Sequence, residues 1–229
     1  MAETSLSNRL SIKRLILVPA LITLGVTFLR LTGELLHWSK TFFSSEPGGG
    51  SAIVGITWLA PVFGIYFALK LSAAGEGPSR PGRAIGLALL GVAMVIAGAF
   101  LAGPLGPLQA RLSFEGILIY YFLLMGLGAA LQYPGWSKLF KVLAAYGYAA
   151  RIPVVVVMFL AFYGNWGTHY DGLPPGITLD YGLWGKFLWL GFFPQMILWL
   201  AYSILFGALF GTIIAVAVRA LRPKQALPS

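Results

Sequence analysis

Long apolar runs separated by short polar segments occupy most of the chain. A helix needs about 20 apolar residues to cross the hydrocarbon core of a bilayer, and five runs have about this length. A further run over residues 183–218 is too long for one simple crossing, and Pro194 inside it removes a backbone donor. We therefore predict an interfacial helix over 183–193 before the last span. The six predicted spans are residues 15–36, 51–71, 84–103, 114–132, 138–163 and 195–218.

The composition agrees with lipid as the main solvent of this chain. Of its 229 residues, 58% are hydrophobic and only 10% are charged, with a mean hydropathy of +0.82. A soluble domain usually has about 25% charged residues on which to build a wet surface. The sequence therefore predicts an all-α, polytopic membrane helix bundle that forms a single transmembrane domain over residues 1–229.

The distribution of basic residues predicts the orientation. Eleven of the 16 Lys and Arg residues fall in segments that the six-span arrangement places on one side, which the positive-inside rule assigns to the cytoplasm. Both termini are then cytoplasmic. The first run lacks a small-x-small cleavage site, so it is interpreted as an uncleaved span. We expect a multi-pass protein of the bacterial cytoplasmic membrane.

Charge and residue usage also exclude several function classes. The net charge of +9 is spread over the ends of apolar runs, which favours contact with lipid headgroups over nucleic acid. The chain has no cysteine, so disulfides, thiolate metal sites and thiol nucleophiles are excluded. It also lacks a Gly-rich phosphate loop, a G-x-S-x-G elbow and an Asp-x-x-Asp pair.

A polar stripe runs along one side of the first predicted span. Its members fall within about 120° of a helix: Thr23, Thr27, Arg30, Glu34, His37, Trp38 and Thr41. Arg30 and Glu34 are four residues apart and can pair. A charged residue inside a span costs about 2.5–3.5 kcal/mol on insertion scales, so this side must face protein or water. It is either a buried salt bridge that orients the helix or the lining of a cavity open to the outer side.

A second charge lies near the middle of the fifth predicted span. Arg151 precedes Pro153 and has no acidic residue within one helical turn. Its counter-charge must therefore come from another helix, with Glu34 and Glu115 as candidates, or from a bound anion such as a lipid headgroup. A free backbone carbonyl four residues before Pro153 is a further local acceptor.

Two polar outer loops, 37–50 and 165–182, are expected to form an ordered cap. They carry both histidines, His37 and His169, together with Asp171 and Trp166. A His/His/carboxylate metal site is conceivable, but zinc motifs are absent. We therefore predict no metal and no cofactor, with these side chains engaged in ordinary loop hydrogen bonds.

Small residues predict where helices pack closely. Gly207, Gly211 and Ala215 recur at four-residue spacing in the last run. In lipid, such residues let helix backbones approach one another. Packing inside the bundle is favoured over a self-association face.

Three function classes remain open. The first is a carrier or lipid- or anion-handling protein with a polar cavity open to the outer face. The others are a non-catalytic membrane subunit or assembly factor, and a membrane-embedded enzyme acting at the outer surface. The expected partners are membrane lipids, an anionic small molecule or lipid headgroup, and further copies or other membrane subunits. The candidate ligand-binding residues are Arg30, Glu34, His37, Trp38, Glu115, Arg151, Trp166, His169 and Asp171.

Overall fold

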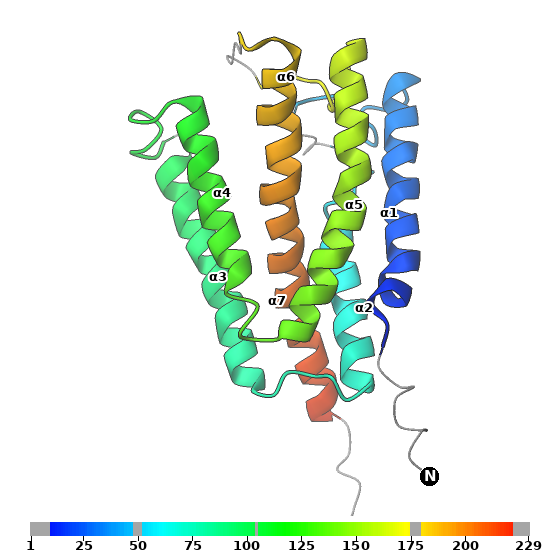
Figure 1. Cartoon of the computed structure of the whole chain (residues 1–229), viewed down its shortest axis with the longest axis vertical. Helices are drawn as coiled ribbons and strands as arrows, with labels where there is room; N and C mark the ends of the chain where they lie inside the picture. The colour runs from blue at the N-terminus through cyan, green and yellow to red at the C-terminus, as the bar shows by residue number, and fades with distance from the viewer. Residues whose placement is uncertain (1–9, 48–51, 104, 175–179, 222–229) are drawn as a thin grey trace, which may run out of the picture.

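The computed structural model describes residues 10–47, 52–103, 105–174 and 180–221. All regular secondary structure in this part of the chain is helical, without a strand (Figure 1). The elements are α1 (Ile12–Leu35), α2 (Leu59–Ala73), α3 (Pro81–Ala102), α4 (Phe114–Ala130), α5 (Ser137–Gly164), α6 (Gly182–Lys186), η1 (Phe187–Phe192), η2 (Pro194–Trp199) and α7 (Leu200–Leu221).

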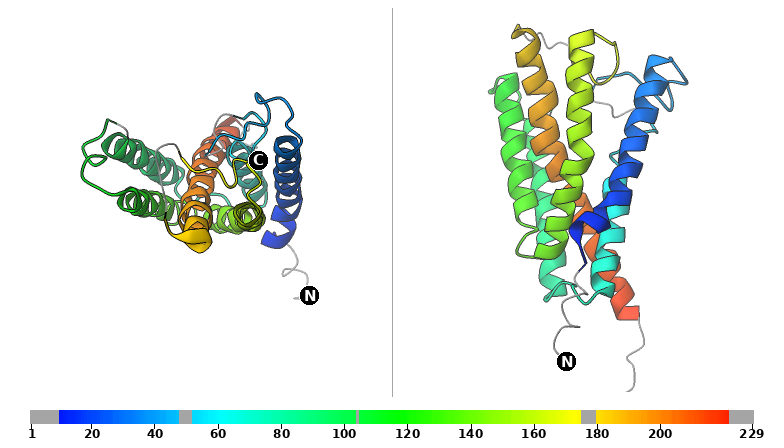
Figure 2. Two further views of the ribbon diagram at one scale, coloured as in Figure 1. Left: turned by 90° about the horizontal axis from the view of Figure 1, so that it is seen from above. Right: turned by 45° about the vertical axis from the view of Figure 1, so that its right-hand side comes forward.

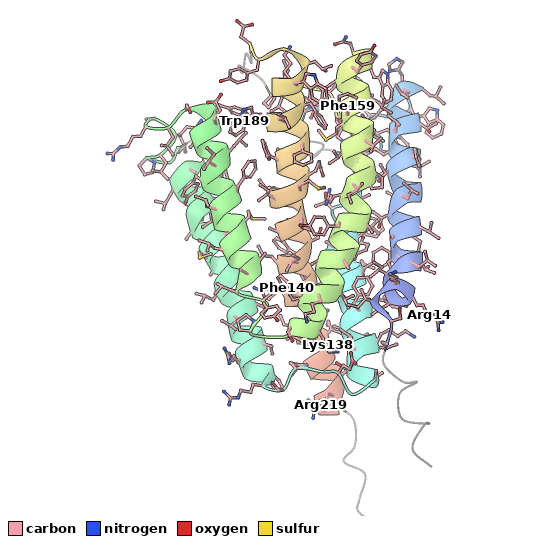
Figure 3. All side chains as sticks on the ribbon, viewed as in Figure 1. Arg14, Lys138, Phe140, Phe159, Trp189 and Arg219 are labelled. Atoms are coloured by element: carbon pink, nitrogen blue, oxygen red, sulfur yellow. The ribbon has the colours of Figure 1, made fainter. Side chains whose placement is uncertain are left out.

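The helices form one bundle with two distinct ends. Helix α1 begins, and α7 ends, at the same end of the bundle (Figure 1). Arg14, Lys138 and Arg219 all lie toward this end, which we call the basic end (Figure 3). The opposite end is covered by the described loop residues 36–47 and 165–174, which we call the cap. Seen along the bundle, α3 and α4 lie on one side, α1 lies on the other, and the final helix runs between them (Figure 2).

Helix length and polarity agree with a membrane bundle. Four helical segments are long and apolar enough to cross a membrane: Ile12–Leu35, Pro81–Ala102, Ser137–Gly164 and Gly182–Leu221. Helices α2 and α4 are also apolar but have only 15 and 17 residues. The predicted all-helical class is thus confirmed, while two of the elements are shorter than a simple crossing requires.

The second predicted span is only partly helical. Helix α2 begins at Leu59, so the prediction of a helix over 51–71 is wrong for residues 52–58, and residue 51 lies outside the described residues. Part of this non-helical stretch is held by the loop before it, because the backbone N–H groups of Ile53 and Val54 donate to the carbonyls of Thr41 and Phe42 at 3.2 and 3.1 Å. Among membrane helices, such backbone is tolerated where protein buries it or where it lines a cavity.

The final run is one continuous helix of 40 residues, Gly182–Leu221. The predicted break at Pro194 is therefore wrong, and 183–193 is not a separate interfacial helix. Instead, η1 and η2 are π-helical and flank Phe193. A π turn has an i→i+5 hydrogen-bond pattern, which allows a helix to continue through a residue that disrupts the regular ladder.

Close packing between α2 and α7 confirms the internal role of the glycine repeat. A side-chain carbon on Gly64 would collide with the backbone of Gly207, and one on Gly207 would meet Leu143 of α5. Gly211 in turn faces the backbone of Gly64. These positions let the two backbones touch, as small residues do in membrane bundles.

We expect Gly207→Leu to destabilise the protein by about 2 kcal/mol, because the added side chain must displace Leu143 of α5 and press on the α2 backbone at Ala60. Gly126→Leu in α4 is the matched control, since no atom lies within 4 Å of an added carbon there. Thermal unfolding in detergent measures both. Equal stability of the two variants would contradict this packing.

Candidate functional site

A buried ion pair within α1 also holds the first cap loop. The Nε of Arg30 donates to Oε1 of Glu34 at 2.8 Å, and the two residues are 6% and 4% exposed. The other end of the Arg30 guanidinium donates from Nη2 to the carbonyl of Ser44 at 3.1 Å. The first cap loop is thereby fixed to the helix that precedes it.

The second cap loop binds the same carboxylate. The backbone N–H of His169 donates to Oε2 of Glu34 at 2.9 Å, and Nδ1 of its ring lies 2.6 Å from Oε1. Glu34 therefore accepts from α1 and from a loop 135 positions away in sequence. Over its described residues, the predicted cap is thus formed by two loops held on one buried ion pair, the first through Arg30 and the second through Glu34.

The predicted polar stripe is correct over the helical part of its length. Thr23 and Thr27 are buried, as are Arg30 and Glu34. The hydroxyl of Thr23 lies 2.8 Å from the hydroxyl of Tyr146 on α5, and Tyr170 donates to the carbonyl of Thr27 at 3.3 Å.

The residues predicted to continue the stripe beyond Glu34 do not lie on the buried side of α1. Helix α1 ends at Leu35, and His37 adopts a left-handed conformation with a φ of 52°. Helical periodicity therefore no longer applies beyond this point. His37, Trp38 and Thr41 are exposed.

Arg151 is buried without an acidic partner among the residues that the structure describes. It is 4% exposed, and its Nη1 donates to Oε1 of Gln195 at 3.3 Å. Its guanidinium lies 5.2 Å from the ring centre of Trp199. Its Nε has no hydrogen-bond partner in the described part of the chain. Of the two alternatives for Arg151, pairing with Glu34 or Glu115 is wrong, because the described residues form ion pairs only between Arg30 and Glu34, Lys138 and Glu76, and His169 and Glu34. A bound anion stays a prediction.

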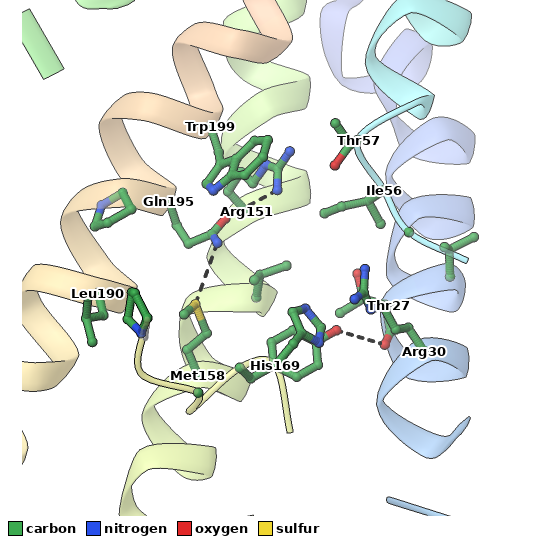
Figure 4. Close-up of a pocket in the computed structure, with 17 residues that line it drawn as sticks. Thr27, Arg30, Ile56, Thr57, Arg151, Met158, His169, Leu190, Gln195 and Trp199 are labelled. Carbon is green, nitrogen blue, oxygen red and sulfur yellow. Dashed lines mark hydrogen bonds between the residues drawn. The ribbon is translucent and has the colours of Figure 1, made fainter. Parts of the chain in front are cut away.

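Arg151 and Arg30 line the same cavity, which has a volume of about 200 Å³ (Figure 4). One wall is formed by the non-helical stretch, including Ile56 and Thr57, and by α1. The opposite wall comes from the final helix and α5. The cap contributes His169, Tyr170, Gly172 and Pro174.

The final helix reaches this cavity through its π-helical segments. Leu190 lies in η1, while Pro194, Gln195 and Trp199 lie in η2. Gln195 also donates to the sulfur of Met158 on α5, at 3.6 Å. π-helical turns occur frequently at functional sites, where they change the direction of side chains.

Several predicted candidates lie apart from the cavity. Glu115 is at the start of α4, where it accepts from the hydroxyl of Tyr181 at 2.8 Å. Asp171 accepts hydrogen bonds from Gly167 and Thr168, so it shapes the second cap loop. Trp166 is exposed and packs against Gly164.

The metal alternative has no support in the described residues, where no three His, Cys, Asp or Glu side chains gather to hold an ion. His37 is exposed, whereas the ring of His169 is bound to Glu34. The two histidines therefore have different environments.

Sequence reasoning missed Gln195, Trp199, Tyr170 and the stretch 55–57 as lining residues. A signal for Gln195 was present, because it is an isolated amide next to Pro194 in a long apolar run. The start of α2 at Leu59 had no comparable signal, since residues 52–58 are as apolar as a helix would be.

A comparison of the chain with models of protein families, with curated proteins and with solved structures found no match.

We expect Glu34→Gln to destabilise the protein by about 3–5 kcal/mol, because it leaves the buried Arg30 without its carboxylate. Glu76→Gln is the matched control. Its partner Lys138 lies 3.6 Å away with a side chain that is 53% exposed, and such a pair contributes about 1 kcal/mol or less. Chemical unfolding in detergent compares the two, and similar losses would contradict the role given to Glu34.

The pKa of His169 gives a pH prediction. Burial lowers this pKa and outweighs the opposing hydrogen bond to Glu34, while the charge of Arg30 lowers it further. The folded protein thus binds fewer protons than the unfolded chain below a pH of about 6.5. We expect the free energy of unfolding to fall as the pH drops from 6.5 to 5, by at most about 1.4 kcal/mol per pH unit.

His169→Gln should reduce this fall, whereas His37→Gln, at an exposed site, should preserve it. Unfolding curves at several pH values test both variants. A wild-type protein that becomes more stable as the pH drops over this range would contradict the assignment.

Proposed function

We propose that the protein is a multi-pass membrane protein that binds an anion at Arg151, as a carrier or as a lipid- or anion-handling protein. The observation that supports this most directly is a buried guanidinium beside a cavity, without a carboxylate partner among the described residues. Ionisable residues inside membrane bundles commonly mark the places where substrates or ions bind or pass.

The surroundings of Arg151 are neutral. Gln195 offers an amide oxygen and Trp199 offers the face of its ring. Both interactions are weaker than pairing with a full negative charge, and the Nε hydrogen-bonding capacity is unused within the described chain. A bound anion would supply the missing charge.

The proposal includes a topology. The basic end lies in the cytoplasm, in line with the positive-inside rule, and the cap lies outside. Residues 52–58 and α2 together make one of six crossings. The cavity then lies toward the outer face of a bacterial cytoplasmic membrane, because His169 and Gly172 of the cap contribute to its lining.

The environment of Arg151 favours binding over a purely structural role. In a non-catalytic subunit we would expect each buried charge to be paired within the protein, as Arg30 is with Glu34. In an enzyme that uses Glu34 as an acid or base, the Glu34 carboxylate would first have to give up hydrogen bonds that it accepts from Arg30 and His169.

The test is Arg151→Met, which keeps the apolar volume and removes the charge. We expect loss of bound anion, or affinity lowered about 10- to 100-fold, as for a hydrogen bond to a charged group. Stability without ligand should be unchanged or higher by up to about 2 kcal/mol, because a desolvated charge has been removed.

Native mass spectrometry of gently extracted protein reports bound lipids and small anions, and thermal unfolding reports stability. Arg83→Met, on the exposed first turn of α3, is the control with the same loss of charge. A stability loss above about 2 kcal/mol with unchanged anion binding would show instead that Arg151 is structural.

A further inference from the structure

The charge balance of the cavity lining limits the charge of its ligand. Two cationic side chains line the cavity, but Arg30 already pairs with Glu34 at 2.8 Å. His169 also lines the cavity, and burial favours its neutral form, as does the nearby Arg30. Arg151 therefore provides a single net positive charge, which a ligand with one negative charge would balance.

The rest of the lining limits the body of the ligand. Much of the cavity lining is apolar or aromatic, including Val26, Ile56, Val154, Met158, Leu190 and Trp199. The volume of about 200 Å³ is somewhat larger than the roughly 150 Å³ of a protein cavity that holds one benzene molecule. The space suits one compact apolar group together with one small anionic group.

Resting on the proposed anion binding at Arg151, we infer that the ligand is a monocarboxylate with a compact apolar body about the size of a benzene ring. The carboxylate accepts hydrogen bonds from the Arg151 guanidinium, a pairing that suits both groups. The body lies among Trp199, Met158 and Leu190. The amide of Gln195 holds Arg151 on the side of the final helix.

A dianion fits this site less well. A phosphate monoester at pH 8 carries close to two negative charges, of which Arg151 balances one. The second charge would remain in a low-dielectric cavity where Arg30, the other arginine of the lining, already pairs with Glu34.

A monocarboxylate can come from two sources, a small organic acid or the head of a fatty acid. Both present the same anionic group to Arg151. They differ in body, because an acyl chain needs a long, narrow space whereas a ring needs a short, wide one. Benzoate and decanoate therefore distinguish the sources.

The experiment measures binding of a ligand panel to the full chain in detergent at pH 8, by isothermal titration. Benzoate has both features, acetate has the charge without the body, and benzyl alcohol has the body without the charge. Phenyl phosphate has the body with two charges, and decanoate has an acyl body. We expect benzoate to bind at least about 10-fold more tightly than each of the others.

Two variants locate the site. Arg151→Lys keeps the charge but loses the planar donor group, so benzoate binding should weaken without being abolished. Trp199→Leu removes one wall of the space for the apolar body, so benzoate binding should weaken while acetate binding is unaffected. Arg83→Met should bind every ligand as the wild type does.

The outcomes separate this inference from the proposed function. If phenyl phosphate binds more tightly than benzoate, the inference that the ligand is a monoanion is wrong, while anion binding at Arg151 is still supported. If decanoate binds more tightly than benzoate, the inference of a compact body is wrong, and a fatty acid is identified as the source of the carboxylate. If none of the anions binds, or if benzyl alcohol binds as tightly as benzoate, both the inference and the proposed function are overturned.

Discussion

An ionised side chain enclosed by apolar helices needs compensation, and this requirement organises the centre of the molecule. Arg30 is compensated within the chain by Glu34. Arg151 is equally buried but faces an amide, an indole ring and a cavity. Because desolvation penalises a charge wherever it lies, the two arginines represent two solutions. One pairs inside the protein, and in our account the other pairs with a ligand.

Irregular structure lies around Arg151. Residues 55–57 of the non-helical stretch line one side of the cavity, and residues of the π-helical segments η1 and η2 line the other. Regular helices would bury most backbone groups and leave little room between them. The departures from regular geometry instead open a space next to Arg151, while α2 and α7 remain tightly packed through Gly64 and Gly207. The irregular parts are thus supported by a rigid part of the bundle.

The fold class could be predicted because the lengths of apolar runs and the positions of charged residues can be read along the chain, without knowledge of tertiary contacts. The same is true of the buried face of α1, where Thr23, Thr27, Arg30 and Glu34 follow helical periodicity. Periodicity could not reveal where the helix stops, so His37 and Trp38 were wrongly included. Partner identity depends on tertiary contacts, which explains why the sequence offers Glu34 and Glu115 as candidate partners of Arg151, beside a bound anion, but does not predict Gln195. Pro194 was read as a break because propensity does not anticipate a π-helical segment.

The central claim is that Arg151 holds an anionic ligand inside the cavity. Anomalous diffraction at the bromine edge, on crystals grown with 4-bromobenzoate, tests it most directly. We expect a bromine peak among Trp199, Met158 and Leu190, with the carboxylate against the Arg151 guanidinium. An empty cavity at saturating ligand, with Arg151 turned onto a carboxylate of the protein itself, would contradict it.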